Sequence, residues 1–328
     1  MKVYRVIAAI GAGVVAVPVG LCVALYAVLV LVNLRDRPPS AAALELERIA
    51  AGLPDVADEE NGFVYALGLQ APRDADPVAV GREHAQRIRE TRDAATAASG
   101  PAEPPIGAAG PGTIEDPAWR SFTAACGDDG YGGCFDALAA GAASIDPLLA
   151  EHAWRLERYR ALLARPAWRE LVTTDAPVAT RFSGWLRFEG RLLHFLEAWR
   201  HAERGDAAAV RALLEDDLAF WRRAARESDT LLTKMVLTSY VGRHFRWGSV
   251  VLARLPAERV RDAIPPSWDE PFDSAERSMR RVFAGELAYM QSMTIRMKDT
   301  GDLFGATRGA RERSFGERFD AHLMRRLF

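Results

Sequence analysis

The apolar and polar residues of this chain are unevenly distributed, and the longest apolar run lies close to the first residue. Over the 27 positions from Val6 to Val32, every residue except Gly11, Gly13, Pro18 and Gly20 is apolar. A helix of that length spans about 40 Å, which exceeds the roughly 30 Å hydrocarbon core of a bilayer. The pattern therefore predicts one transmembrane helix, at residues 6–32, that anchors the chain in a lipid bilayer.

Two other interpretations of this run are open, a cleaved signal peptide and a buried helix of a soluble protein. A signal peptide has an apolar region of only about 7–15 residues, followed closely by a cleavage site. Here the charged segment Asn33-Leu34-Arg35-Asp36-Arg37 follows a much longer run. The pattern therefore favours a retained signal-anchor, with residues 1–5 as a short cytoplasmic segment.

Beyond residue 32 the apolar residues recur every three or four positions, which is the spacing of amphipathic helices. Helices are predicted at residues 41–51, 58–69, 77–98, 144–165, 178–204 and 273–298, with two more beginning after Asp206 and Asp229. No run alternates with the period of a strand. Short turns between consecutive long helices imply antiparallel packing. We therefore expect an all-α fold, in which the transmembrane helix precedes a helical bundle with antiparallel helical hairpins.

Proline and glycine indicate where this helical part is divided. The segment Ser99–Gly112 holds four prolines and four glycines in 14 residues, which sustains neither a helix nor a strand. We expect a membrane-proximal helical segment at residues 33–98 and a Pro/Gly-rich linker with a cysteine loop at residues 99–143. The helical bundle follows at residues 144–300 and a basic tail at residues 301–328.

Cys126 and Cys134 enclose a short glycine-rich loop, so their side chains can approach to disulfide distance. Such a bond persists only in an oxidising compartment. The basic residues that flank the apolar run are nearly balanced, and the cysteine pair favours export of the chain after residue 32. We expect a single-pass protein of the bacterial inner membrane with a periplasmic domain. Two free thiols are the alternative.

Composition supports a bacterial source and argues against a nucleic-acid partner. Arginine supplies 39 of the 42 basic residues and alanine is abundant, as a GC-rich coding sequence produces. The chain has 44 acidic residues and a net charge of −2, whereas a nucleic-acid-binding face requires clustered positive charge. We therefore expect no nucleic-acid partner.

Aromatic residues gather on the predicted helix at residues 178–204. Trp185, Phe188, Leu192, Phe195 and Trp199 are spaced by three or four residues and form one stripe, and Trp221 lies on the next helix. Large aromatic side chains build the cores of helical bundles. The alternative is a groove at these residues for an apolar ligand or a partner protein.

Candidate chemistry is sparse. His194, Glu197 and His201 share one helix face, so we consider them as metal ligands, although di-iron bundles place the acid before the histidine and use that motif twice. The sequence holds neither a Gly-x-Ser-x-Gly motif nor a phosphate-binding loop that ends in Gly-Lys-Ser/Thr. We assign no catalytic residue, no cofactor and no enzyme activity. The alternative is an envelope hydrolase or metal-dependent enzyme that uses this face.

A scattered set of residues forms no motif with a chemistry of its own: Asn61-Gly62, Gly68, Ala71-Pro72, Asp76-Pro77, Gly81, the cysteine pair and Lys234-Met235. At these positions the chain resembles single-pass membrane proteins of GC-rich proteobacteria, loosely over residues 1–300. The resemblance implies no activity and no functional residue. The sequence thus favours a membrane-anchored periplasmic binding or scaffold protein, with a protein partner or an apolar ligand.

Overall fold

The computed structural model describes residues 20–21, 23–31, 38–94, 114–127, 131–170 and 189–300. The chain divides into two compact units, a large one from Leu46 to Arg296 and a small one that comprises residues 1–45 and 297–328. The described residues form helices and no β-strand, which confirms the all-α fold class.

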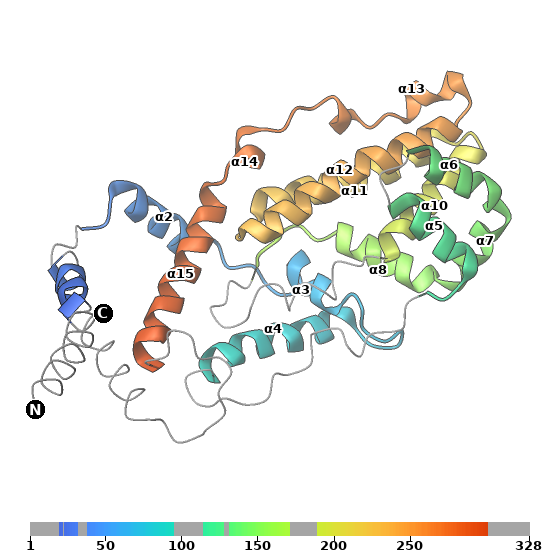
Figure 1. The fold of residues 1–328 in the computed structure, drawn as a ribbon. Coiled ribbons are helices and arrows are strands. Elements are labelled where there is room, and N and C mark those ends of the chain that lie inside the picture. The colour runs from blue at the N-terminus through green and yellow to red at the C-terminus, as the bar shows by residue number, and fades with distance from the viewer. Residues whose placement is uncertain are drawn as a thin grey trace, which may run out of the picture. The chain divides into compact units, whose positions relative to one another are not determined.

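Figure 1 shows the helices of the described residues in chain order. They are α2 Ala41–Ala51, α3 Gly62–Gly68, α4 Pro77–Ala94, α5 Pro117–Gly127, α6 Tyr131–Ala140, α7 Ala142–Glu151, α8 Ala153–Leu163, α10 Glu189–Glu203, α11 Ala207–Glu227, α12 Leu231–Arg254, α13 Val260–Ala263, α14 Ser274–Arg277 and α15 Arg280–Thr300. Two 3-10 turns, η1 Ala257–Arg259 and η2 Pro266–Trp268, flank α13.

Side chains at the helix starts explain why several predicted boundaries are confirmed. Asp76 accepts a hydrogen bond from Val78 N–H and precedes Pro77, the first residue of α4. Asp206 accepts from Ala209 N–H at the start of α11, and Asp273 forms a capping box with Glu276 at the start of α14. These caps satisfy backbone N–H groups that have no partner within the helix.

Several predicted details are wrong. The helix expected at residues 273–298 is the short helix α14 followed by α15, which begins at Arg280. The helix expected at residues 58–69 begins only at Gly62.

The segment expected to be a linker and cysteine loop contains α5 and α6, because their apolar faces are buried by the rest of the large unit. The helix expected at residues 144–165 is two helices that meet at His152. Thr230, not Asp229, caps α12, because its side chain accepts from Thr233 N–H while the Asp229 carboxylate binds arginines.

The core of the large unit lies around α10, α11 and α12, which pack on one another. One group of buried side chains joins these helices to α5, α6 and α7, and a second joins α11 and α12 to α3 and α8. Trp268 packs against both groups. Figure 1 shows α11 and α12 running side by side through the unit. Residues on both sides of Ser99–Gly112 belong to this one unit, and that segment itself lies outside the described residues.

Asn61 attaches α3 to the segment that follows α8. Its Oδ1 accepts from Phe63 N–H, which caps α3, and from Arg169 N–H at 2.9 Å. Its Nδ2 donates to the Arg169 carbonyl at 2.8 Å, and Gly62 N–H donates to the Ala167 carbonyl. One buried amide therefore joins two segments that are more than a hundred residues apart in sequence.

Arg158, in α8, binds the turn between α3 and α4. Its guanidinium donates to the carbonyls of Ala71 at 2.5 Å, Pro72 at 2.7 Å and Ala75 at 2.8 Å. Burial lowers the pKa of Arg158. Because carbonyl groups compensate the buried guanidinium here, this arginine serves to fix the turn.

Two glycines allow α3 and α4 to touch through their backbones. A Cβ atom at Gly68 would lie 1.9 Å from the Pro77 carbonyl oxygen, and one at Gly81 would lie 2.1 Å from the Val64 carbonyl oxygen. No side chain fits at either contact, so the presence of glycine at both positions is explained by helix packing.

Gly68→Ala is expected to lower the free energy of unfolding by about 1–3 kcal/mol, because the new methyl group forces α3 away from α4. The matched control is Gly242→Ala in α12, where a Cβ atom would meet no atom within 4 Å. That change should stabilise the protein by about 0.5–1 kcal/mol, since alanine is the better helix former. Urea unfolding of both variants measures the difference, and equal midpoints would contradict the packing argument.

Candidate functional site

Four buried polar side chains from α8, α10, α11 and α12 converge in the large unit, and we call them the Asp217 cluster. Arg191 Nε and Nη2 donate to the two carboxylate oxygens of Asp217 at 3.0 and 2.8 Å. The Tyr159 hydroxyl donates to Asp217 Oδ1, and His244 Nδ1 lies 2.8 Å from Oδ2. One carboxylate therefore links four helices.

The surroundings of Asp217 keep it ionised. Burial alone would raise the pKa of this carboxyl, but the Arg191 charge and the hydrogen bonds from His244 and Arg191 hold it well below its ordinary value. Burial and the Asp217 charge together raise the pKa of Tyr159 well above its usual range. The cluster thus contains a carboxylate, a guanidinium and a neutral phenol.

His244 and Asp217 have the arrangement of a general-base pair, but both are fully buried. Trp268 Nε1 lies 2.9 Å from His244 Nε2. Because an indole N–H only donates, Nε2 accepts and the ring proton lies on Nδ1, where it is donated to Asp217. Both ring nitrogens are thus occupied, so we interpret His244 as a structural link between α12 and η2.

Arg191 is also surrounded by aromatic rings. Its guanidinium carbon lies 5.0 Å from the centre of Tyr240, 5.3 Å from Trp221 and 5.8 Å from both Phe195 and Trp247. Such contacts stabilise a cation whose water has been removed. The aromatic residues around α10 therefore enclose a charge that belongs to the chain itself.

A second buried cluster consists of Glu170 and Asp229 with two arginines, and we call it the Glu170 cluster. Arg169 Nη1 and Arg281 Nε donate to the Asp229 carboxylate at 2.5 and 2.7 Å. The Glu170 carboxylate accepts from Asp229 N–H and from the Thr230 hydroxyl, both at 2.9 Å. Burial, with the Asp229 charge as the second cause, raises the pKa of Glu170 to about 7.

This raised pKa predicts a pH-dependent stability. The folded state binds the Glu170 proton more tightly than the unfolded state, whose carboxyl has a pKa near 4.5. The stabilising contribution is therefore complete below about pH 4.5 and is lost as the pH rises through 7. At about 1.4 kcal/mol per pKa unit, the loss amounts to about 3 kcal/mol.

Glu170→Gln should remove this dependence, because the amide imitates the protonated acid. The free energy of unfolding of the wild type, relative to the variant, should fall by about 2.5 kcal/mol between about pH 5 and pH 8. Urea unfolding at several pH values measures it. A difference that stays constant over this range would show that Glu170 does not titrate there.

The described residues of the alternative groove lie in the interior of the large unit. Leu192, Phe195, Trp199 and Trp221 are buried in the core of the large unit, where the helices cover them. They are therefore not open to a ligand. The sequence left open whether these residues form a core or a groove, and their burial supports the core. Trp185 and Phe188 lie outside the described residues.

His194, Glu197 and His201, the candidate metal ligands, each bind a different partner. His194 is buried with its Nε2 2.8 Å from the Leu213 carbonyl, Glu197 pairs with Arg160, and His201 Nδ1 lies 3.1 Å from Asp206 Oδ2. The three side chains thus face different partners, because α8, α11 and the turn after α10 each take one of them. The described residues contain no group of three potential metal ligands.

The cysteine prediction is confirmed at the level of distance, since Cys126 and Cys134 lie within bonding distance. Both are buried in the core, at the end of α5 and near the start of α6. Trp247 Nε1 donates to the Cys126 carbonyl at 2.9 Å. The cysteine pair therefore holds α5 and α6 together where they contact α12.

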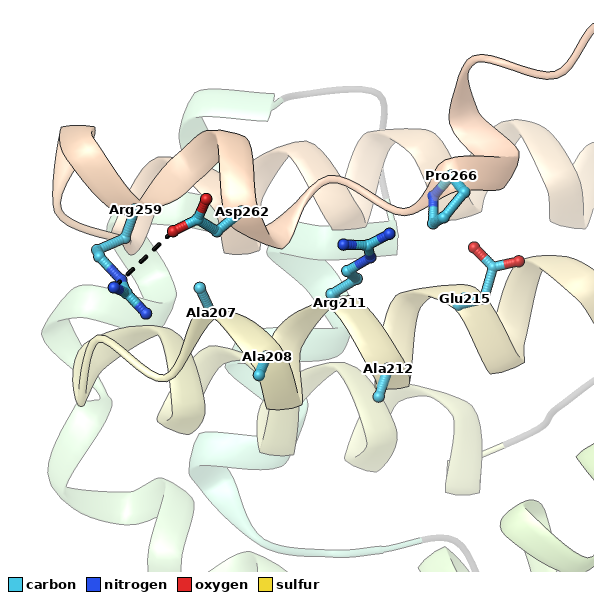
Figure 2. Close-up of a pocket in the computed structure, with 8 residues that line it drawn as sticks. All are labelled: Ala207, Ala208, Arg211, Ala212, Glu215, Arg259, Asp262 and Pro266. Carbon is cyan, nitrogen blue, oxygen red and sulfur yellow. Dashed lines mark ion pairs between the residues drawn. The ribbon is translucent and has the colours of Figure 1, made fainter.

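A hollow of about 380 Å³ opens on the surface of the large unit beside the start of α11 (Figure 2). It is lined by Ala207, Ala208, Arg211, Ala212, Glu215, Arg259, Asp262 and Pro266. Arg259 lies 3.8 Å from Asp262, and Glu215 accepts from the Ser267 hydroxyl at 2.8 Å. Because charges of both signs line an open hollow, its geometry selects no class of ligand.

In the small unit, the described helical residues 20–21 and 23–31 present large apolar side chains to the outside. Leu21 is 72% exposed, Leu25 62% and Leu31 62%. The remaining residues of the predicted anchor at 6–32 lie outside the described set. Among the described helices, none has by itself the length and apolar composition needed to cross a bilayer. Two consecutive described helices, Gly132–Ala140 and Ala142–Glu151, reach this length and composition when they are taken together, but they are bent by 81° where they meet.

Comparison of the chain with family models, with curated proteins and with solved structures finds no match. Sequence reasoning missed both buried clusters, although one signal was present. Asp217 lies three residues after Leu214 and four before Trp221, and so interrupts an apolar stripe with a charge. A charge in such a position requires a buried partner.

Proposed function

We propose that this chain is a membrane-anchored helical binding or scaffold protein, held in the bacterial inner membrane by residues 6–32. In this proposal its folded part lies in the periplasm, and its partner is a protein or an apolar ligand. The buried ionic clusters serve in this proposal to keep the helical body rigid.

The observation that carries the proposal is the exposure of apolar side chains on the described helical residues 20–21 and 23–31. In the large unit, the comparable leucines and tryptophans of α10 and α11 are buried. A continuous row of exposed leucine and valine is unfavourable in water and favourable in hydrocarbon, whereas single exposed residues need no explanation. Lipid around this helix removes the unfavourable contact with water.

The cysteine pair supports the proposed compartment. Cys126 and Cys134 lie within bonding distance in the core, and such a bond is stable where the surroundings are oxidising. The periplasm meets this condition and the cytoplasm does not. We therefore propose that the chain crosses the membrane once, through the anchor at residues 6–32, and that the large unit folds after export.

The proposed body of the protein is a set of antiparallel helical hairpins. Support comes from α10, α11 and α12, which pack on one another and are joined by short connections at residues 204–206 and 228–230. Such connections leave a following helix little choice except to return along its predecessor. A body of this kind offers long outer helix faces to a partner.

Membrane fractionation tests the anchoring. The full chain and a variant that lacks residues 6–32 are expressed in a bacterium, and the membranes are washed with alkaline carbonate. The full chain should stay in the washed membranes and the variant should be released. Release of the full chain would overturn the proposal.

A further inference from the structure

Although the scattered set of residues that includes Asn61-Gly62 forms no motif as a whole, this dipeptide has a chemistry of its own. Asparagine is a chemically labile residue, and its side chain is attacked most easily by the backbone nitrogen of a following glycine, where no Cβ atom obstructs the approach. The chain holds two asparagines, and the other, Asn33, precedes leucine. Asn61 is therefore the asparagine whose neighbour favours the reaction.

The reaction is a deamidation and consumes only water. The Gly62 nitrogen loses its proton to hydroxide and forms a bond to Asn61 Cγ. The bond from Cγ to Nδ2 breaks, and Nδ2 takes up a proton and leaves as ammonia. Water then opens the resulting five-membered succinimide ring at either of its carbonyl groups. The product is aspartate or isoaspartate, and isoaspartate adds one carbon atom to the backbone.

In the folded chain each reacting group is already occupied. Gly62 N–H donates to the Ala167 carbonyl at 2.8 Å, so the attacking nitrogen retains its proton. Asn61 Nδ2, the leaving group, donates to the Arg169 carbonyl at 2.8 Å, and Oδ1 accepts from two backbone N–H groups. Asn61 is 2% exposed and Gly62 is buried, which keeps hydroxide and water away. The contact between the start of α3 and residues 167–169 therefore opposes the reaction.

The same contact explains why the reactive pair is present. A Cβ atom at position 62 would lie 3.2 Å from both the Ala167 carbonyl oxygen and the Phe220 ring, a tight fit that favours glycine. An amide is needed at position 61, because one side chain there accepts from backbone N–H groups and also donates to a carbonyl. Packing thus selects both residues of a pair that is labile when it is separated from residues 167–169.

Deamidation also hinders the contact from forming again. With aspartate at position 61, a carboxylate oxygen replaces Nδ2 and faces the Arg169 carbonyl, and two acceptors in this position repel each other. The Arg169 side chain does not compensate the new charge, because its guanidinium is paired with Asp229. The contact is therefore weaker after the reaction than before it.

We propose that Asn61 is a deamidation site that the fold controls. The contact with residues 167–169 keeps the side chain unmodified, and separation of these residues from α3 permits a one-way conversion to aspartate or isoaspartate. The inference goes beyond the proposed function and depends neither on the anchor nor on the compartment.

Peptide mass spectrometry of the full chain in detergent tests the site. The protein is incubated at mildly alkaline pH with and without guanidinium chloride and is digested with trypsin at intervals. Conversion of Asn61 is followed by the change in mass, with Asn33 as the internal control in the same digests. Hydrogen exchange at the Gly62 amide of the folded chain measures the fraction of molecules in which the contact is open.

We expect Asn61 to convert at least about 100-fold more slowly in the folded chain than in guanidinium chloride, and this ratio should match the open fraction within about threefold. In guanidinium chloride Asn61 should convert faster than Asn33. Equal rates in the folded and unfolded chain, or a folded rate that does not follow the open fraction, would overturn the inference.

A variant outside the reacting pair provides a second comparison. Glu227 accepts from Trp168 N–H at 2.7 Å, so Glu227→Ala loosens residues 167–169 without altering Asn61. Conversion should become about tenfold faster, because a hydrogen bond to a charged group is lost. Asp216→Ala, at an exposed position of the same helix, should leave the rate unchanged. Equal rates in these two folded variants would contradict the proposal, and the wild-type comparison decides it if Glu227→Ala does not fold.

Asn61→Asp tests the one-way character, because it imitates one product. Hydrogen exchange at the Gly62 amide should be at least about tenfold faster in this variant than in the wild type, since the new carboxylate repels the Arg169 carbonyl. Exchange at the wild-type rate would show that the contact forms again after deamidation and would overturn this part of the proposal.

Discussion

Asp217→Ala is expected to lower the free energy of unfolding by about 3–5 kcal/mol, which is a large part of the stability of an ordinary domain. The change leaves the Arg191 guanidinium inside the core without its carboxylate. It also removes the acceptor of the Tyr159 hydroxyl and of His244 Nδ1. Urea unfolding of the full chain in detergent, followed by tryptophan fluorescence, measures the effect.

The neighbouring residue provides the control. Asp216 is exposed on the same helix, so Asp216→Ala removes an equal charge without opening the core and should change stability by no more than about 0.5 kcal/mol. A double variant, Asp217→Leu with Arg191→Met, should be more stable than Asp217→Ala, because no unpaired charge remains buried. Equal stabilities of the two aspartate variants would contradict the role given to the cluster.

Replacing both Cys126 and Cys134 with alanine is expected to lower the free energy of unfolding by about 2.5 kcal/mol. The bond closes a short loop, with a sequence separation of 8, and so restricts the unfolded chain. It also holds α5 and α6 at the point where Trp247 donates to the Cys126 carbonyl. Thermal unfolding with and without a reducing agent measures the contribution.

The reducing agent separates the bond from the side chains. The wild type should lose this stability on reduction, whereas the double variant should unfold at the same temperature in both conditions. An unfolding temperature of the wild type that does not respond to complete reduction, checked by thiol labelling, would contradict a stabilising bond.

Helix boundaries were predictable where a local signal defines them. Ser40 precedes α2, Asp76-Pro77 begins α4, and Gly205-Asp206 separates α10 from α11, where Gly205 has a φ of 72° that favours glycine. Such caps act within a few residues and are visible in the sequence.

The helices α5 and α6 lacked such signals. Their glycines indicate a loop, and the helices form because Trp119, Phe122 and Leu138 become buried against helices much later in the chain. The same reason explains why the sequence left the choice between core and groove open. Periodicity shows that Phe195 and Trp199 share a face, but only the packed fold shows that other helices cover that face.

The buried clusters were beyond sequence reasoning for a geometric reason. Asp217 binds Arg191, Tyr159 and His244, which are 26, 58 and 27 residues away in sequence. No spacing rule connects residues on four different helices. His194 and His201 share a helix face, but they do not bind a common partner. His194 lies beside the Leu213 carbonyl and His201 beside the Asp206 carboxylate.

The proposed export of the large unit across the membrane is tested most directly with reporter fusions. Alkaline phosphatase, which is active only after export, or a green fluorescent protein, which is bright only in the cytoplasm, is fused after residue 328 and expressed in a bacterium. The account predicts an active phosphatase fusion, a dark fluorescent fusion, and loss of phosphatase activity when residues 6–32 are deleted. An inactive phosphatase together with a bright fluorescent fusion would contradict it.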